Sequence, residues 1–245
     1  MYFKNNIKEY VKIPYAIIIN CNDYMYETLK DNNEINNMKN IFINEKYFNK
    51  KRFHGTLTKG ICFNMEYALK RFKFEYFMIL SSSNIFKLEV NNTNYNDFDK
   101  IDGFYFNDVN KYNCCINCTK LNEDKNNTHI YRSPNCTYWH WSSFFKSKLG
   151  EYVIRNNLKF GASYHEGLIF QYDTCTLIKN FLLKNPTITN DLFNYPACVE
   201  EFALQTICCS NNNSYYHIGS HFVHADPKVR RPSDERRFVY KIDRK

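Results

Sequence analysis

Two adjacent glutamates, Glu200 and Glu201, interrupt the segment "NYPACVEEFALQTICC" (194–209), which otherwise has the apolar pattern of a half-buried helix. Neighbouring side chains on a helix are about 100° apart, so one of these carboxylates must lean toward the apolar side. An ionised carboxylate can take the proton of a hydroxyl group as a general base. The alternative is structural, because a helix beginning near Val199 would be stabilised by acidic residues in its first turn.

A second pair of polar residues, His165 and Glu166, stands in "YHEGLIF" (164–170). The apolar residues that follow indicate a buried strand, so the His-Glu-Gly turn places two polar side chains at the rim of a sheet. Side chains at such a rim can bind a substrate, and a solvated turn is the alternative.

The third candidate is the basic segment "RRFVYKIDR" (236–244). Arg236, Arg237, Lys241 and Arg244 have helical spacing, which puts Arg237 and Lys241 on one side of the expected helix. Arginine offers a forked donor and lysine a point charge to phosphoryl oxygens, so the segment can bind phosphate. A solvated basic helix is the alternative. The formal net charge of +8 also favours an anionic ligand.

Two metal-binding patterns are incomplete. Four cysteines of the middle segment contain one C-x-x-C pair, which is half of a zinc site: Cys114, Cys115, Cys118 and Cys136. Asp97 and Asp99 match the Asp-x-Asp with which nucleotide-sugar enzymes hold a divalent cation, but they do not follow a buried strand. We interpret the aspartates as a solvated turn, and the cysteines as reduced surface thiols with zinc binding left open.

Short apolar runs alternate with a helical pattern in the first third of the chain. The runs at 15–21, 40–44 and 74–80 predict buried strands, and the periodic segment 55–74 predicts a helix. Such alternation implies βαβ units, a parallel sheet and a ligand crevice at the carboxyl ends of the strands. Candidates for lining that crevice are Asn22, Asn44, Ser83 and Asn84.

The 245 residues are expected to form a single α/β domain, 1–245. Its parts are a nucleotide-binding half (14–89), an irregular insertion rich in Asn, Asp, Thr and Cys (90–137), and a second half with the basic tail (138–245). In the second half a strand feeds an amphipathic helix that stops before Pro186. The glutamate helix and a strand over "YYHIGSHFV" follow.

Composition excludes several classes of protein. The 20 tyrosines and 21 phenylalanines predict an aromatic core, and no apolar run is long enough to span a membrane. The first 25 residues lack a signal-peptide pattern, so we expect an intracellular protein with reduced thiols. Cysteines at apolar positions are Cys21, Cys62, Cys175 and Cys208. Nucleic acid is not an expected partner, because neither a recognition helix nor an RNA-binding aromatic motif accompanies the basic charge.

The order of these segments is similar to that of the core-2/I-branching N-acetylglucosaminyltransferase and xylosyltransferase family. The matching pieces are "PYAIIINCNDY", "NIFIN", "GICFNMEYAL", "YFMILSSSNIF", "GLIFQYDTCTLIKNFLLKN", "CVEEFALQTI" and "FVYKID". They span residues 14–243, and the insertion at 90–137 matches poorly.

The resemblance implies a GT-A fold, with a Rossmann-like, mostly parallel central sheet flanked by helices. It implies inverting transfer of a sugar from a UDP-sugar to a hydroxyl of a glycan or glycoprotein, without a metal or other cofactor. Glu201 matches the family's catalytic base, Thr206 a threonine that follows it, and Lys241 the diphosphate-binding lysine. The other expected donor-binding residues are Arg236, Arg237, Asn22, Asn44, Ser83 and Asn84, and the expected substrate-binding residues are His165, Glu166 and Glu200.

Two positions depart from the family's pattern. The second diphosphate-binding residue aligns near Gly219, so we expect Arg230, Arg231, Arg236 or Arg237 to replace it. Asn84 stands where the family has an aspartate, which leaves the donor sugar open. A non-catalytic nucleotide- or glycan-binding module on the same fold is the alternative function. The acceptor, the linkage and the oligomeric state are not determined by the sequence.

Overall fold

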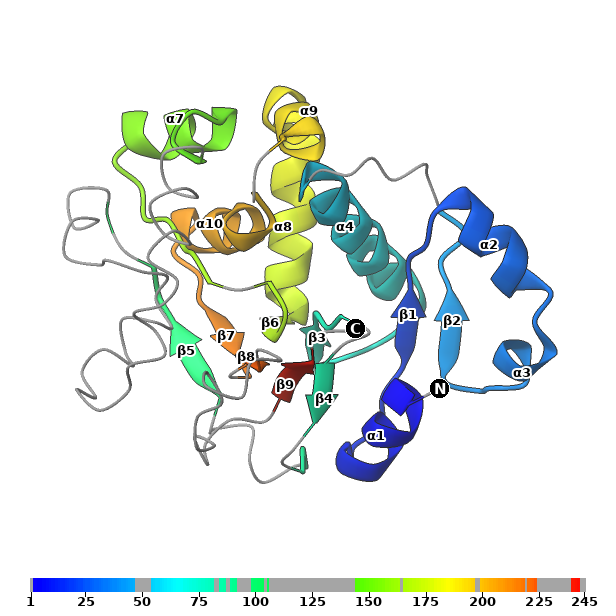
Figure 1. Cartoon of the computed structure of the whole chain (residues 1–245). Coiled ribbons are helices and arrows are strands. Elements are labelled where there is room, and N and C mark those ends of the chain that lie inside the picture. Colours follow the sequence, from blue (N-terminus) through cyan, green and yellow to red (C-terminus); the bar gives the residue numbers. More distant parts are fainter. Residues whose placement is uncertain are drawn as a thin grey trace.

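The computed structural model of the chain (Figure 1) describes residues 2–46, 54–81, 84–86, 89–91, 98–103, 105, 144–163, 165–196, 199–218, 220–223 and 239–242. It has a mixed α/β architecture, which confirms the expected class. The helices are α1 (Tyr2–Tyr10), α2 (Asp23–Lys30), α3 (Asn33–Asn36), α4 (His54–Arg71), α7 (Lys148–Arg155), α8 (Tyr172–Lys184), α9 (Pro186–Asn194), the 3-10 turn η4 (Val199–Glu201) and α10 (Ala203–Ser210). The strands are β1 (Ile17–Ile19), β2 (Ile41–Ile43), β3 (Tyr76–Met78), β4 (Asn84–Phe86), β5 (Asp99–Ile101), β6 (Leu168–Gln171), β7 (Tyr215–His217), β8 (Ser220–Val223) and β9 (Val239–Ile242).

The described strands form three sheets, in the orders β1–β2, β3–β6–β7–β5 and β4–β9–β8. Strands β1 and β2 are parallel, with Ile17 opposite Ile41, and β8 and β9 are also parallel. Every pair in the four-stranded sheet is antiparallel. The expectation of one mostly parallel central sheet is therefore wrong for the strands that the structure describes.

Strand β6 shows why the sequence could not give the strand direction. Leu168 and Phe170 belong to one buried apolar cluster, and Ile169 between them belongs to another. A strand buried on both faces has a continuous apolar run whether its neighbours are parallel or antiparallel. Its direction is decided by partner strands that lie far away in the sequence.

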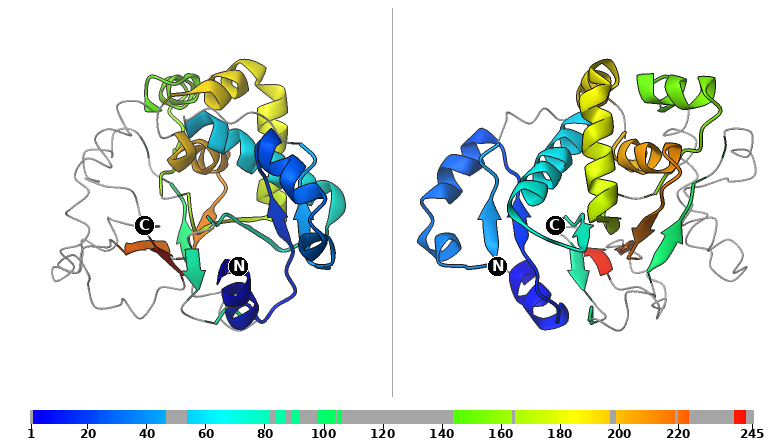
Figure 2. Two further views of the ribbon diagram at one scale, coloured as in Figure 1. Left: turned by 45° about the vertical axis from the view of Figure 1, so that its right-hand side comes forward. Right: turned by 180° about the vertical axis from the view of Figure 1, so that it is seen from behind.

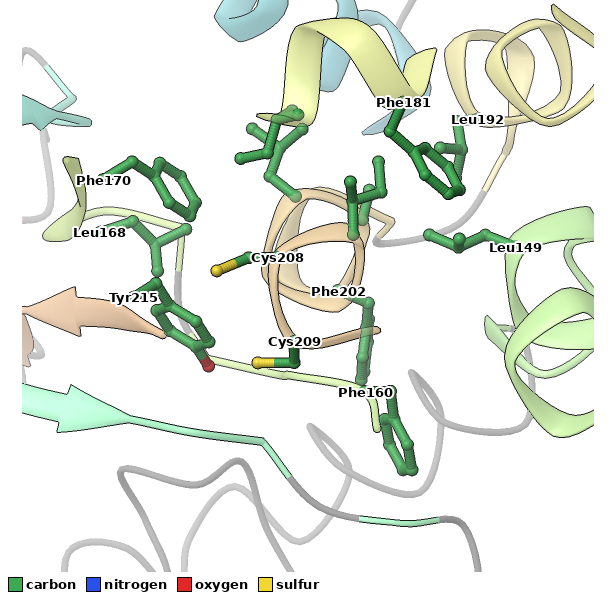
Figure 3. Close-up of a cluster of buried hydrophobic side chains, with 14 of the residues drawn as sticks. Leu149, Phe160, Leu168, Phe170, Phe181, Leu192, Phe202, Cys208, Cys209 and Tyr215 are labelled. Atoms are coloured by element: carbon green, nitrogen blue, oxygen red, sulfur yellow. The ribbon is translucent and has the colours of Figure 1, made fainter. Parts of the chain in front are cut away.

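The larger apolar cluster lies between the four-stranded sheet and helices α4, α7, α8, α9 and α10. Figure 3 shows its centre, where α10 presents Cys208 and Cys209 toward the sheet and Tyr215 of β7 lies beside them. Helix α8 lies between α4 and α10 (Figure 2). Aromatic rings contribute as expected: Phe144 stacks on Phe202 with ring centroids 5.0 Å apart.

The smaller apolar cluster joins α1 to the other face of the sheet, with Ile7, Phe86 and Ile169 among its members. The side chain of Asn6 pairs with the backbone of Phe86 in both directions: its Nδ2 donates to the carbonyl at 3.0 Å, and its Oδ1 accepts from the amide at 2.6 Å. Helix α1 was not expected from the sequence. Tertiary contact with β4, rather than a local signal, explains its position.

Helix α4 links the glutamate turn to the first sheet. Its first turn packs against the end of α9, where the Gly55 amide donates to the Tyr195 carbonyl at 3.1 Å. A Cβ at Gly55 would lie 2.6 Å from the carbonyl oxygen of Leu192, so only glycine fits there. Farther along α4, the side chain of Asn64 donates to the carbonyl of Ile18 in β1 at 3.1 Å.

Several predicted elements agree with the structure. The strands at 15–21, 40–44 and 74–80 contain β1, β2 and β3, and the helix at 55–74 is α4. The amphipathic helix ends before Pro186 as expected, although Pro186 then begins α9, which was not expected. None of the described helices is long and apolar enough to cross a membrane.

Three predicted elements need correction. The α-helix after the glutamates begins at Ala203, so Glu200 and Glu201 lie in the preceding 3-10 turn η4. The strand over "YYHIGSHFV" is divided between β7 and β8, which belong to different sheets. In the basic tail, residues 239–242 form strand β9 instead of a helix, because they pair with β4 and β8.

Candidate functional site

An extended segment, residues 161–163, is held onto α10 and β7 by side-chain hydrogen bonds to each of its carbonyls in turn. Thr206 Oγ1 donates to the first carbonyl at 3.0 Å, the Tyr215 hydroxyl to the second at 3.1 Å, and Gln205 Nε2 to the third at 3.1 Å. All of these residues are buried. The segment is therefore fixed in position up to Ser163.

Gly161 allows this close approach. A Cβ at Gly161 would lie 2.9 Å from a ring carbon of Tyr215 and 3.0 Å from the Cβ and carbonyl oxygen of Gln205. Any larger residue would push the segment away from α10 and β7.

The same segment is bonded to the glutamate turn η4. The backbone amide of Ser163 donates to the carbonyl of Glu201 at 3.0 Å, and Gln205 Nε2 also donates to the carbonyl of Glu200 at 3.3 Å. One carboxylate of the pair does lean toward the apolar side: Glu200 is 4% exposed, whereas Glu201 is only partly buried. The partly exposed carboxylate is the one that a substrate can reach.

His165 and Glu166 follow this segment after one residue, Tyr164, which lies outside the described residues. His165 Nδ1 lies 3.4 Å from the carboxylate oxygen Oε2 of Glu166, whose side chain is buried. Gly167 then turns the chain with φ of 95°, and its amide donates to the carbonyl of Ile79 at 2.7 Å. Ser163 is thus bonded to η4, and Gly167 is bonded to the residue that follows β3. The bonds of Ser163 and Gln205 therefore join the turn that carries Glu200 and Glu201 to the segment that precedes His165 and Glu166 in the chain.

The expected donor-binding residues divide into two groups. Asn84 of β4 lies opposite Lys241 of β9 in an antiparallel pair, so two candidates from distant parts of the chain meet in one small sheet. Ser83, Arg236 and Arg237 lie outside the described residues, as do Arg230 and Arg231.

Asn22 and Asn44 stand just after β1 and β2, as predicted, but their side chains take part in the fold. Asn22 Oδ1 caps α2 by accepting from the Met25 amide at 2.8 Å. The buried Asn44 donates through Nδ2 to Asn64 Oδ1 at 3.0 Å and accepts from the Lys46 amide at 2.9 Å. Through Asn64, α4 is therefore connected both to Asn44 after β2 and to β1. No local pattern in the sequence indicated Asn64 as this link.

Charged residues surround this connection. Glu66 of α4 lies 2.6 Å from Lys46 and 2.7 Å from Lys70. Hydrogen bonds from these two ammonium groups lower the pKa of the Glu66 carboxyl below its ordinary value. Lys46 also lies over the ring of Phe63, 4.9 Å from its centroid. The surface is cationic in part, but its charges are largely paired.

The described residues contain no group of three or more His, Cys, Asp or Glu side chains placed to hold a metal. The candidate zinc cysteines, Cys114, Cys115, Cys118 and Cys136, lie outside the described residues, as does Asp97. Asp99 belongs to β5 instead of a solvated turn. The described cysteines, Cys21, Cys62, Cys175, Cys208 and Cys209, are free thiols, which confirms the expected reduced state for these positions.

Sequence reasoning missed the residues that hold the site together, above all Gln205 and Ser163. The signal that could have found Gln205 is its position, because Gln205 and Thr206 are adjacent polar residues in a helix whose every residue is buried. A buried carboxamide must find hydrogen-bond partners, and backbone carbonyls outside regular secondary structure are groups that it can bind.

No protein-family model, no curated protein and no solved structure matches the chain.

Proposed function

We propose that the protein is an inverting glycosyltransferase that moves a sugar from a UDP-sugar to a hydroxyl acceptor. The observation that carries the proposal is the hydrogen bond from the Ser163 amide to the Glu201 carbonyl, which joins the glutamate turn to the segment containing His165 and Glu166. The turn held by this bond carries a partly exposed carboxylate, and transfer to a hydroxyl requires such a group as general base. The fold that accompanies this activity is GT-A-like.

In the proposed reaction, Glu201 takes the proton of the acceptor hydroxyl as its oxygen bonds to the anomeric carbon of the donor sugar. The bond between that carbon and the UDP oxygen breaks on the opposite face, and its electron pair leaves with UDP. Inversion follows because attack and departure occur on opposite faces. His165 is assigned to binding a sugar hydroxyl group, and the buried Glu166 and Glu200 are assigned to supporting His165 and Glu201.

The leaving UDP gains negative charge, which fixed cations must stabilise when no metal does so. Lys241 is assigned this role, together with Arg236 or Arg237. The pairing of β4 with β9 supports the assignment, because it brings the backbone of Lys241 to Asn84, the first residue of the strand that follows β3. No divalent metal or other cofactor is required in this proposal.

A thermal-shift screen with UDP-GlcNAc, UDP-xylose, UDP-glucose and UDP-galactose, with and without EDTA, identifies the donor. Transfer is then measured for the wild type, Glu201→Gln and Glu200→Gln. We expect Glu201→Gln to bind the donor normally and to lose about a hundredfold or more in turnover, the usual scale of a lost general base. Near-normal turnover with only a lower melting temperature would show that Glu201 has a structural role.

The alternative, a non-catalytic nucleotide- or glycan-binding module, gives a different result in the same screen. It predicts that UDP binds to the wild type but that no donor is hydrolysed or transferred.

A further inference from the structure

Gln205 is fully buried on α10 and contacts two different segments of the candidate site. Its Nε2 donates to the carbonyl of Ser163 at 3.1 Å and to the carbonyl of Glu200 at 3.3 Å. One carboxamide group therefore holds the extended segment and the glutamate turn at a fixed separation. The Tyr215 hydroxyl, by comparison, donates to the carbonyl of Ala162 within the extended segment.

The orientation of the Gln205 carboxamide is determined by these two bonds. A flipped amide would place Oε1 against two carbonyl oxygens, which cannot donate. In the observed orientation Oε1 is buried and has no hydrogen-bond partner among the described residues, and the same holds for Ser163 Oγ. Burying the unpaired Oε1 of Gln205 costs free energy, and an apolar residue of the same size would fill the space on α10 without that cost. Core packing alone therefore does not explain a glutamine at this position.

We propose that Gln205 is a positioning residue for the reaction, setting the place of Glu201 relative to His165 and Glu166. This inference rests on the proposed transferase function. Glu201 has no rigid α-helix of its own, since it ends a 3-10 turn. Loss of the Gln205 bonds would allow that turn to move away from Ser163, and a displacement of about 1 Å can reduce catalysis about a hundredfold.

The test compares Gln205→Met with Tyr215→Phe. Methionine nearly matches the shape of glutamine but cannot donate, so both bonds are lost. Tyr215→Phe is the matched control, because it removes one buried hydrogen bond to the same segment without touching η4. For each variant we would measure kcat, the KM of the donor, the affinity for UDP, and hydrogen exchange at the Ser163 amide, which reports on its bond to Glu201.

We expect Gln205→Met to lower kcat at least about tenfold, to keep the affinity for UDP within about twofold, and to speed exchange of the Ser163 amide. Tyr215→Phe should keep kcat and Ser163 exchange close to the wild type while lowering the melting temperature. If Gln205→Met does not fold, Gln205→Asn, which keeps the amide but shortens its reach, should show the same pattern.

The inference is overturned if Gln205→Met keeps wild-type kcat, or if its kcat and that of Tyr215→Phe fall in parallel with stability. It is also overturned if Ser163 exchange is unchanged. A wild type that transfers no sugar, together with faster Ser163 exchange in Gln205→Met, would instead reject the proposed function while confirming that Gln205 holds the turn.

Discussion

Asn84 and Lys241 lie directly opposite each other in the antiparallel pair of β4 and β9, although they come from distant parts of the chain. Strand β9 also pairs in parallel with β8, so it is the central strand of its small sheet. A lysine in a central strand has a backbone position set by hydrogen bonds on both sides. The backbone at Lys241 is therefore held more firmly than it would be in the basic helix expected for the tail.

Replacing Lys241 with alanine should weaken UDP binding. A charged donor facing a diphosphate contributes about 1.5–3 kcal/mol, so the Kd measured by calorimetry should rise roughly 10- to 150-fold. Lys148→Ala is the control. Lys148 is an exposed residue of α7, and its side chain forms a salt bridge with Glu151 of the same helix. Equal UDP affinity for wild type and Lys241→Ala would show that Lys241 does not bind the diphosphate.

Transfer should not depend on a divalent metal. The Asp-x-Asp pattern is not at the end of β3, where a metal bound to a donor would be held, and Asp99 is instead paired within β5 and β7. Activity measured in EDTA should match that of the untreated protein. Activity that disappears in EDTA and returns with manganese would contradict this and would give Asp97 and Asp99 a catalytic role.

Asn64→Ala should destabilise the fold, because it removes the bonds to Ile18 and Asn44 and leaves their polar groups without these partners. The expected loss in the free energy of unfolding is about 1–3 kcal/mol, measured by urea titration. The control is Asn36→Ala, which removes an exposed side-chain bond to the Lys30 carbonyl. If both substitutions cost the same, the link between α4 and β1 contributes no special stability.

The ion pairs of Glu66 should make stability depend on acid. Bonds from Lys46 and Lys70 lower the pKa of Glu66 in the folded state below its ordinary value of 4.5. A carboxyl group whose pKa is lowered by folding stabilises the folded state fully at pH values above its ordinary pKa. This stabilisation is lost as the pH falls through the pKa of the folded state. The melting temperature of Glu66→Gln should therefore be lower than that of the wild type at pH 7, with the difference shrinking in acid.

Glu45→Gln is the control for that experiment. The Glu45 carboxylate lies 3.3 Å from Arg71, but its side chain is 73% exposed. Exposed pairs of this kind contribute little to stability. A pH-dependent effect of Glu45→Gln as large as that of Glu66→Gln would show that general surface charge, rather than the two lysine contacts, is responsible.

Cys62 and Cys175 should resist alkylation in the folded protein. Burial raises the pKa of the Cys62 thiol to about 12 and also raises the pKa of Cys175, so little of the reactive thiolate exists at pH 8. Iodoacetamide labelling followed by peptide mass spectrometry should find both residues unmodified in native protein and modified in guanidinium chloride. Native labelling of Cys175 at the rate of a free thiol would mean that the packing around α8 opens readily.

The sequence by itself determined the local elements with strong periodicity or clear boundaries. Short apolar runs were sufficient for β1, β2 and β3, the 3.6-residue period for α4, and Pro186 for the end of α8. These signals are local, because they depend on which faces of one element are apolar and on where the backbone cannot continue.

Only the tertiary structure decided which carboxylate is buried, which strands pair, and what holds the site. Glu200 is buried because η4 is bonded to Ser163 and Gln205, and β9 is a strand because β4 and β8 lie beside it. These choices depend on hydrogen-bond partners brought together from distant parts of the chain. Backbone and carboxamide groups of the same types occur throughout the sequence. No local pattern could therefore identify which donor and which acceptor form a hydrogen bond in the folded core.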